Sequence, residues 1–205
     1  MIYKMHYQIM EYLFSEKRDD TITFSKSLFY KITKNTPADY TFGKISYKKD
    51  SLMVPYSVIK DAKTHKDNNV QEIVLLASER PYRVPHIRST LDTWGLNSYI
   101  DYLYTVSELA FLEGLTPIFE GSFFSPSELK KISEILAFIK ILVPSTNIDY
   151  YEKKYPTDVA KKHLDIRLKM LEWTGKLNIP IVSGILIGAD ESIEKMKKTL
   201  DTILS

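Results

Sequence analysis

Apolar and polar positions follow two different periods along this chain. Over residues 2–13 and 98–112 apolar side chains recur every three or four positions, which predicts amphipathic helices. Shorter stretches such as residues 74–77 are apolar throughout, as expected for strands that a parallel sheet buries on both faces. The two kinds of segment alternate, and this alternation indicates an α/β fold built from βα units.

The pattern predicts strands over residues 23–32, 74–77, 115–119, 137–143 and 181–187. It predicts helices over residues 2–13, 54–66, 84–93, 98–112, 158–177 and 191–204, and a further helix that begins with Ser125, Pro126, Ser127 and Glu128. After a leading helix, βα therefore repeats about five times, which predicts a parallel sheet with right-handed crossovers. Such a sheet is either open and doubly wound or part of a (β/α) barrel. No glycine-rich dinucleotide fingerprint follows the first strand, which argues against a Rossmann fold.

Length and composition narrow the class of protein. A chain of 205 residues is expected to form one domain. We expect a helix and linker over residues 1–20 and one α/β domain over residues 21–205. Lys and Arg number 28 against 26 Asp and Glu, so nothing indicates nucleic acid or a charged membrane surface as a partner. With no bilayer-length apolar run and no signal peptide, we expect a cytoplasmic protein.

The sequence contains no cysteine, which excludes disulfides, thiolate zinc sites and a cysteine nucleophile. It also excludes a conventional cysteine-ligated iron–sulfur cluster. The four histidines are scattered, and no pair of them has the spacing of metal ligands. We therefore expect no metal site and assign no catalytic residue.

Polar residues follow every predicted strand, at the end where parallel α/β proteins bind their ligands. In chain order they are Thr36, Asp39 and Tyr40, then Ser78, Glu79 and Arg80, then Glu120, then Ser145, Thr146 and Asn147, then Gly188, Asp190 and Glu191. Loops are polar in any case, so this set alone favours solvent exposure over a site. Two other residues add to it. Arg167 lies in a helix, where an arginine is usually a surface residue, and Gly184 lies in a strand, where glycine often marks a close backbone approach.

A collinear series of motifs resembles a known family. Residues 75–81 read Leu-Leu-Ala-Ser-Glu-Arg-Pro, and residues 96–103 read Leu-Asn-Ser-Tyr-Ile-Asp-Tyr-Leu. Further on come Arg167, Gly-Lys-Leu-Asn-Ile-Pro at 175–180, Gly-Ile-Leu-Ile-Gly at 184–188, and Glu191. From about residue 21 to 192 the chain resembles the CofG-type radical S-adenosylmethionine enzymes, the synthases of the deazaflavin chromophore FO. The resemblance implies a partial (β/α) TIM-like barrel with its ligand at the carboxyl ends of the strands.

The resemblance also implies roles for single residues. Glu79 falls where the family binds the amino group of S-adenosylmethionine, and Ser78 precedes it in place of a glycine. Arg167 falls at a contact to the carboxylate of that ligand, which suits a guanidinium. Gly184, Gly188 and Glu191 fall in a motif that borders the adenine. Beside this set we expect two of the polar residues after the strands, Glu120 and Asn147, to bind substrate.

The departures from the family are concentrated at the cluster. Its CxxxCxxC loop would lie between Lys34 and Phe42, where the chain has no cysteine. Without thiolates no cluster is expected, and reductive cleavage of the ligand then has no electron source. Pro144 and Ser145 replace a Glu-Asn pair, and Asp190 stands where a glycine is expected. The chain also ends where a sixth strand would follow, which would leave the fifth strand as an open edge.

Our leading hypothesis is a degenerate relative, a pseudoenzyme of deazaflavin biosynthesis. It would bind an S-adenosylmethionine-type ligand or act as a scaffold, pairing with a second copy or another subunit through the open edge. The alternative is a non-radical enzyme that acts on a small metabolite with Glu79, Glu120, Asp39 and Glu191 as acid–base groups and Arg167 as an anion clamp. A third possibility is a decayed gene product.

Overall fold

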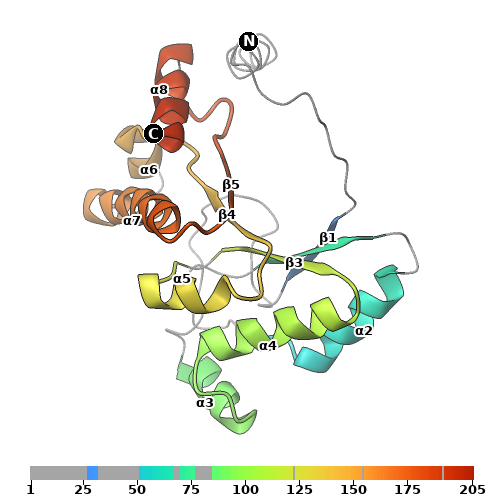
Figure 1. Ribbon diagram of the computed structural model, residues 1–205. Coiled ribbons are helices and arrows are strands. Elements are labelled where there is room, and N and C mark those ends of the chain that lie inside the picture. Colours follow the sequence, from blue (N-terminus) through green and yellow to red (C-terminus); the bar gives the residue numbers. More distant parts are fainter. Residues whose placement is uncertain are drawn as a thin grey trace. The chain divides into compact units, whose positions relative to one another are not determined.

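The computed structural model describes residues 27–31, 51–66, 70–76, 85–121, 123–153, 155–190 and 192–205 (Figure 1). The elements in chain order are β1 Ser27–Lys31, α2 Pro55–Lys66, β2 Glu72–Leu76, α3 Pro85–Thr93, α4 Tyr99–Leu112, β3 Thr116–Glu120, α5 Pro126–Ile132, β4 Phe138–Leu142, α6 Ile148–Glu152, α7 Thr157–Lys176, β5 Ile181–Gly184 and α8 Ile193–Leu204. The predicted α/β class is confirmed. The helix predicted over residues 2–13 lies outside the described residues.

The strands form one sheet in the order β1-β2-β3-β4-β5. β1 pairs with β2, β2 with β3 and β3 with β4, all in parallel. Between β4 and β5, the Ile139 N–H donates to Pro180 O at 3.1 Å and the Val143 N–H donates to Gly184 O at 3.0 Å. The residue numbers rise together along both segments, so this pairing is also parallel. Because the strand order follows the chain without reversal, it matches a (β/α) barrel and not a doubly wound sheet. The strand order therefore supports the predicted partial barrel over the open, doubly wound sheet.

The chain forms two compact units, which are interleaved along the sequence. The unit with β1 to β3 comprises Ser25–Lys140 and Trp173–Ile181 and is called the N-terminal unit below. The unit with α6 and α8 comprises Ile141–Glu172 and Val182–Ser205, apart from residues that are not described, and is called the C-terminal unit. The prediction of a single domain over residues 21–205 stays a prediction.

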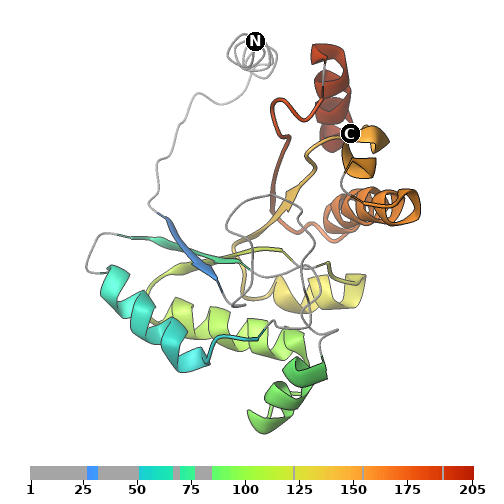
Figure 2. The ribbon, with the colours of Figure 1, turned by 180° about the vertical axis from the view of Figure 1, so that it is seen from behind.

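In the N-terminal unit, α2 and α4 lie side by side against β1 to β3 (Figures 1 and 2). Apolar residues of the strands and of α4 are fully buried there, among them Ile73, Leu75 and Leu103. The Tyr102 hydroxyl donates to Met53 O at 2.8 Å, which joins the start of α4 to the segment before α2. Burial of apolar surface and this bond hold the helix layer on the sheet.

Helix α5 begins where the sequence predicts it. Ser125 accepts a hydrogen bond from the Glu128 N–H, and the Glu128 carboxylate accepts one from the Ser125 N–H at 2.7 Å. This capping box satisfies two backbone donors that the first turn leaves free. Pro126 occupies the first helical position, where its missing N–H costs nothing.

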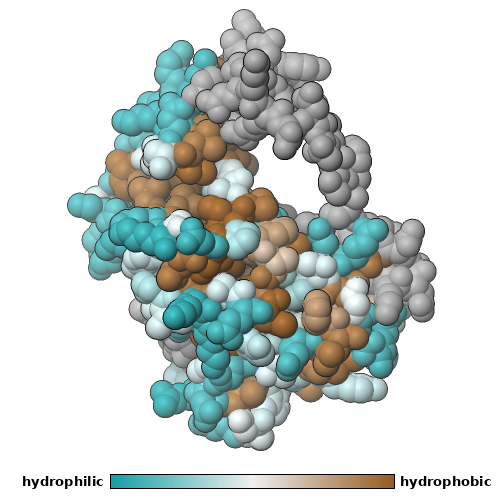
Figure 3. Space-filling view, in the orientation of Figure 1, coloured by the Kyte–Doolittle hydropathy of each residue, from teal (hydrophilic) through white to brown (hydrophobic). Residues whose placement is uncertain are grey.

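In the C-terminal unit, α8 is amphipathic. Met196 and Leu200 are buried and pack against Ile185, Ile187 and Ile193. The visible side of α8 is hydrophilic (Figure 3), as expected for a surface helix. None of the described helices is both long enough and apolar enough to cross a membrane.

Two elements differ most from the sequence prediction. Helix α6 was not predicted, because five residues give too short a periodic signal. Strand β5 ends at Gly184 rather than at residue 187. The chain turns after it, with the Ala189 N–H donating to Leu186 O at 3.0 Å and Gly188 at φ +89°. An apolar run alone cannot locate that turn.

Candidate functional site

The structure describes five of the eight predicted site residues. Arg167, Gly184, Gly188 and Asn147 lie in the C-terminal unit, and Glu120 lies in the N-terminal unit. Ser78, Glu79 and Glu191 lie outside the described residues, as does the segment 35–42. The roles assigned to all eight stay predictions, and the geometry below is given for each unit by itself.

The polar residues that follow β4 and β5 meet in the C-terminal unit. The Ser145 hydroxyl donates to Asp190 Oδ2 at 2.7 Å, and the Asn147 N–H donates to Ser145 Oγ at 2.8 Å. Ser145 is fully buried and Asp190 is 4% exposed. These are two positions at which the sequence departs from the resembled family, and here they contact each other.

The other carboxylate oxygen of Asp190 is buried, and no described residue donates a hydrogen bond to it. A buried acceptor without a partner carries the full cost of its desolvation, about 1–3 kcal/mol and more when it is charged. A hydrogen-bond donor from outside the described residues that reached this oxygen would remove that cost.

A second pair of hydroxyls ties α8 to the same segment. The Thr146 N–H donates to Thr199 Oγ1 at 3.0 Å, and the two hydroxyl oxygens are also 3.0 Å apart. The Thr199 hydroxyl is 3.1 Å from Lys195 O, one turn earlier in the helix. These bonds position the residues after β4 independently of any ligand.

Asn147, which we expected to bind substrate, caps α6. Its side-chain oxygen accepts a hydrogen bond from the Asp149 N–H at 3.2 Å. Asparagine is among the residues preferred at this position. The cap accounts for Asn147 structurally, and the substrate contact stays a prediction.

Arg167 is buried within α7, with 7% of its surface exposed, so the usual interpretation of a helical arginine as a surface residue is wrong here. Its Nη1 donates to His163 O at 3.0 Å and lies 3.5 Å from His163 Nδ1. The His163 ring stacks on Tyr155, with centroids 4.3 Å apart. A guanidinium held in this way suits a ligand carboxylate, because its planar fork binds both oxygens.

The Gly-Ile-Leu-Ile-Gly motif at residues 184–188 has a glycine at each end, and only one of the two positions requires a glycine in the structure. Gly188 has a φ of +89°, a conformation that other residues adopt only with strain. At Gly184 an added Cβ would lie 3.7 Å from Leu142 Cδ2, an ordinary contact. The described residues therefore explain the glycine at 188 and do not explain the one at 184.

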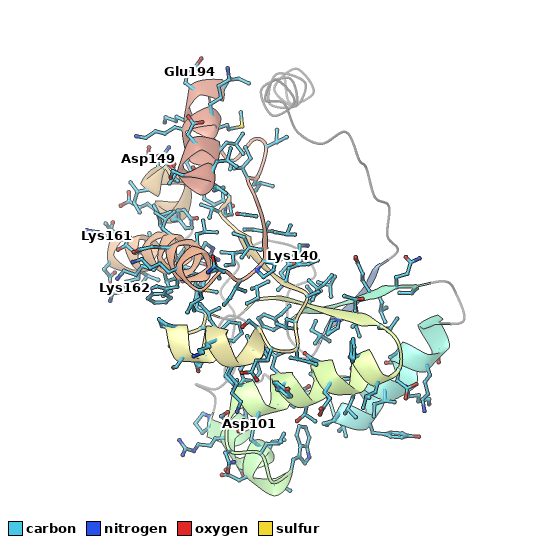
Figure 4. The ribbon with its side chains drawn as sticks, in the orientation of Figure 1. Asp101, Lys140, Asp149, Lys161, Lys162 and Glu194 are labelled. Carbon is cyan, nitrogen blue, oxygen red and sulfur yellow. The ribbon has the colours of Figure 1, made fainter. Side chains whose placement is uncertain are left out.

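Glu120 in the N-terminal unit has a partner that the sequence analysis missed. Its carboxylate lies 2.8 Å from Lys140 Nζ, and the two side chains are 11% and 18% exposed. They are register partners on adjacent strands, and Lys140 is labelled on β4 in Figure 4. The available signal was a single lysine within the otherwise apolar run of residues 137–143.

The residues present do not fit an iron–sulfur cluster held by cysteines. None of the 205 residues is a cysteine, so the chain has no thiolate to bind such a cluster. Among the described residues, no group of three His, Asp or Glu side chains could hold a metal ion either. No step of a reaction is therefore assigned to a cluster.

Comparisons with known proteins agree with the motifs. No protein-family model matches the chain. It is 30% identical over 183 residues to the 7,8-didemethyl-8-hydroxy-5-deazariboflavin synthase of Methanococcus aeolicus, covering 87% of this chain and 51% of that protein. It is 25% identical over 181 residues to the synthase of the same name from Methanothermobacter thermautotrophicus, covering 87% of this chain and 55% of that one. The chain thus spans about half the length of the curated relatives it matches.

A solved structure supports the fold. Methylornithine synthase (PylB) superposes with a TM-score of 0.58 at 14% identity, over 86% of this chain and 49% of that one. The resemblance predicted from the motifs at 75–81 and 167–192 is confirmed. The chain is a relative of the 7,8-didemethyl-8-hydroxy-5-deazariboflavin synthases, with the fold of a partial (β/α) barrel.

Proposed function

We propose that this chain binds an S-adenosylmethionine-type ligand and does not cleave it to a radical. The observation that carries the proposal is the absence of cysteine from residues 35–42, where the family's cluster loop would lie. Thiolates hold such a cluster, and the cluster delivers the electron that breaks the ligand. The chain therefore lacks the electron source while it keeps motifs of the ligand site.

Arg167 supports retention of ligand binding. It is 7% exposed, and it lies at the position that the resemblance assigns to the ligand carboxylate, for which a guanidinium is a suitable partner. Gly188 supports it too, because its positive φ forms the turn that the β5 motif requires. The proposed role is that of a ligand-responsive, non-catalytic protein.

Calorimetric titration with S-adenosylmethionine and S-adenosylhomocysteine tests this function. We expect micromolar binding that Arg167→Ala abolishes, since the charge-assisted bonds to the carboxylate are lost. Arg88→Ala is the matched control, because Arg88 is an exposed arginine on α3, and it should bind like the wild type. If neither compound gives heat or a thermal shift with the wild-type protein, the function proposed here is wrong.

Anaerobic reconstitution with iron and sulfide tests the cluster separately. We expect no stoichiometric iron and no charge-transfer absorption. Incorporation of both elements in stoichiometric amounts would contradict the cluster-free part of the proposal and leave ligand binding to be judged by calorimetry.

The Glu120–Lys140 pair favours a second candidate, a non-radical enzyme acting on a small metabolite. The pair places a carboxylate and an amine 2.8 Å apart near the carboxyl end of β3, where (β/α) folds bind substrates. Such neighbours can exchange a proton with a bound molecule. A metabolite panel should then reveal turnover that Glu120→Gln removes and Asp101→Asn, at an ion pair of α4 and α5, leaves intact. A panel without turnover would rule out this candidate.

A further inference from the structure

Helices α2 and α4 of the N-terminal unit expose neighbouring apolar and charged side chains to solvent. Phe111 and Leu112, in the last turn of α4, are 59% and 73% exposed. Lys60 on α2 and Glu108 on α4 are exposed as well. Figure 3 shows hydrophobic surface at α2 and the end of α4. Adjacent exposed apolar side chains with charged residues around them are typical of a surface that binds another protein.

The two helices run in the same direction within one layer. Near their starts, the Tyr102 hydroxyl donates to Met53 O at 2.8 Å. At their ends, Lys63 Nζ lies 3.2 Å from Glu113 Oε1. Lys60 lies one turn before Lys63 and is therefore level with the last turn of α4. Since the layer covers one side of the sheet, the exposed side chains of both helices form one face, called the α2–α4 face below.

The two helices of this face carry charges of opposite sign. α2 contains three lysines and one aspartate, whereas α4 contains two acidic residues and no basic residue. Neither Lys60 nor Glu108 forms an ion pair with a described residue. The Lys63–Glu113 pair is itself open to solvent, with side chains 62% and 25% exposed. The α2–α4 face therefore offers a basic helix and an acidic helix side by side, and its complement in charge is a second copy of itself.

We propose that the α2–α4 face binds a second copy of the chain across a twofold axis parallel to the two helices. Rotation about this axis sets α2 of each copy on α4 of the other. Lys60 of one copy then faces Glu108 of the other, at two equivalent places. The aliphatic stems of the α2 lysines cover Phe111 and Leu112 of the opposite copy. Closed twofold dimers of this kind are the commonest assemblies of identical chains.

The charges select this axis over the other simple arrangement. A twofold axis running across the helices would place α2 on α2 and α4 on α4. Lysines would then meet lysines and acidic residues would meet acidic residues, which costs free energy in an interface. The inference does not rest on ligand binding, because it concerns residues to which neither the proposed function nor the motif resemblance assigns a role.

Sedimentation equilibrium of the full chain tests the dimer. We expect the wild type to form a dimer of micromolar affinity. Leu112→Lys should raise the dimer dissociation constant about 10-fold or more, because it sets a positive charge against the lysines of the opposite α2. Leu112 is 73% exposed, and a basic residue suits the last turn of a helix, so this variant should fold like the wild type.

An exchange of charges tests the pairing itself. Lys60→Glu and Glu108→Lys should each raise the dissociation constant about 10-fold or more, since like charges then face each other at both places. An equimolar mixture of the two variants should recover most of that loss. In the mixed dimer opposite charges again face each other at both places, which a general effect on folding or solubility would not reproduce.

The matched control is Lys130→Glu, which reverses an exposed lysine on α5, outside the α2–α4 face. It should leave the dissociation constant unchanged, and thermal midpoints of all variants should show that they are folded. A wild type that stays monomeric throughout the micromolar range overturns the inference. A dimer that none of the three variants on the face weakens overturns it too, as does a mixture that associates no better than its components.

Discussion

The ion pair between Glu120 and Lys140 gives a sharp test of what stabilises the N-terminal unit. The side chains are 11% and 18% exposed, which is nearer to a buried pair than to a surface pair. Removing one partner of a buried pair costs about 3–5 kcal/mol, whereas exposed pairs contribute at most about 1 kcal/mol. We expect Lys140→Met to cost about 2–3 kcal/mol, because it leaves the largely buried Glu120 carboxylate without its cation.

Replacing both partners should behave differently. In Glu120→Leu/Lys140→Met no charge remains to be desolvated, and apolar side chains of similar length fill the space. Such replacements of buried pairs are often neutral or stabilising. We therefore expect the double variant to recover most of the loss and to unfold within about 1 kcal/mol of the wild type.

Urea denaturation followed by tryptophan fluorescence measures these free energies. Trp94 and Trp173, the two tryptophans of the chain, both fall within the N-terminal unit, so their signal reports on the unit that holds the pair. The control is Lys131→Met, whose lysine is 50% exposed and pairs with Asp101, and it should cost about 1 kcal/mol or less. Equal losses for both lysines, or a double variant that loses the sum of its single variants, would refute the reasoning.

Three further predictions concern local structure. Ser125→Ala removes the capping box of α5 and should lower the free energy of unfolding by about 1 kcal/mol in urea titrations; no loss would mean that the cap is dispensable. Gly188→Ala should lower the free energy of unfolding by about 1 kcal/mol, because residue 188 has a φ of +89°. Gly175→Ala should raise it by about 0.5–1 kcal/mol, because Gly175 lies in α7 with open space where a Cβ would be. A change of the same sign in both variants would contradict this account. The hydrogen bond from Lys131 lowers the pKa of Asp101 below its usual range. The stability that the ionised Asp101 carboxylate contributes is therefore present above about pH 4, and it is lost as the pH falls through the lowered pKa in the folded protein. The difference in unfolding free energy between the wild type and Asp101→Asn should shrink in that acidic range and stay constant above about pH 5, and a difference independent of pH would rule out the pairing.

The sequence predicted the elements that depend on local signals. Helix α2 was predicted to within one residue, and α5 was located by its cap, its proline and its acidic first turn. The alternation of strands and helices predicted the parallel sheet. It left two closures open, because strand order depends on contacts between residues far apart in sequence.

The site was less predictable than the fold for the same reason. Polar residues after β4 and β5 were expected at one edge, but the sequence does not show that Ser145 bonds to Asp190, 45 residues away. Lys140 lies within a predicted strand, but the sequence does not show that its partner is Glu120 of the neighbouring strand. Burial of Arg167 was likewise invisible, because a helical period does not say which face a neighbouring element covers.

The interleaving of the two units has a consequence for synthesis of the chain. The N-terminal unit needs Trp173–Ile181, since the Ile139 N–H pairs with Pro180 O. That segment leaves the ribosome after Ile141–Glu172, which belongs to the C-terminal unit. Neither unit is therefore a continuous piece that folds and waits for the other. Both complete their structure during the same late stretch of translation, and a nascent chain halted before residue 173 should remain susceptible to proteases in both.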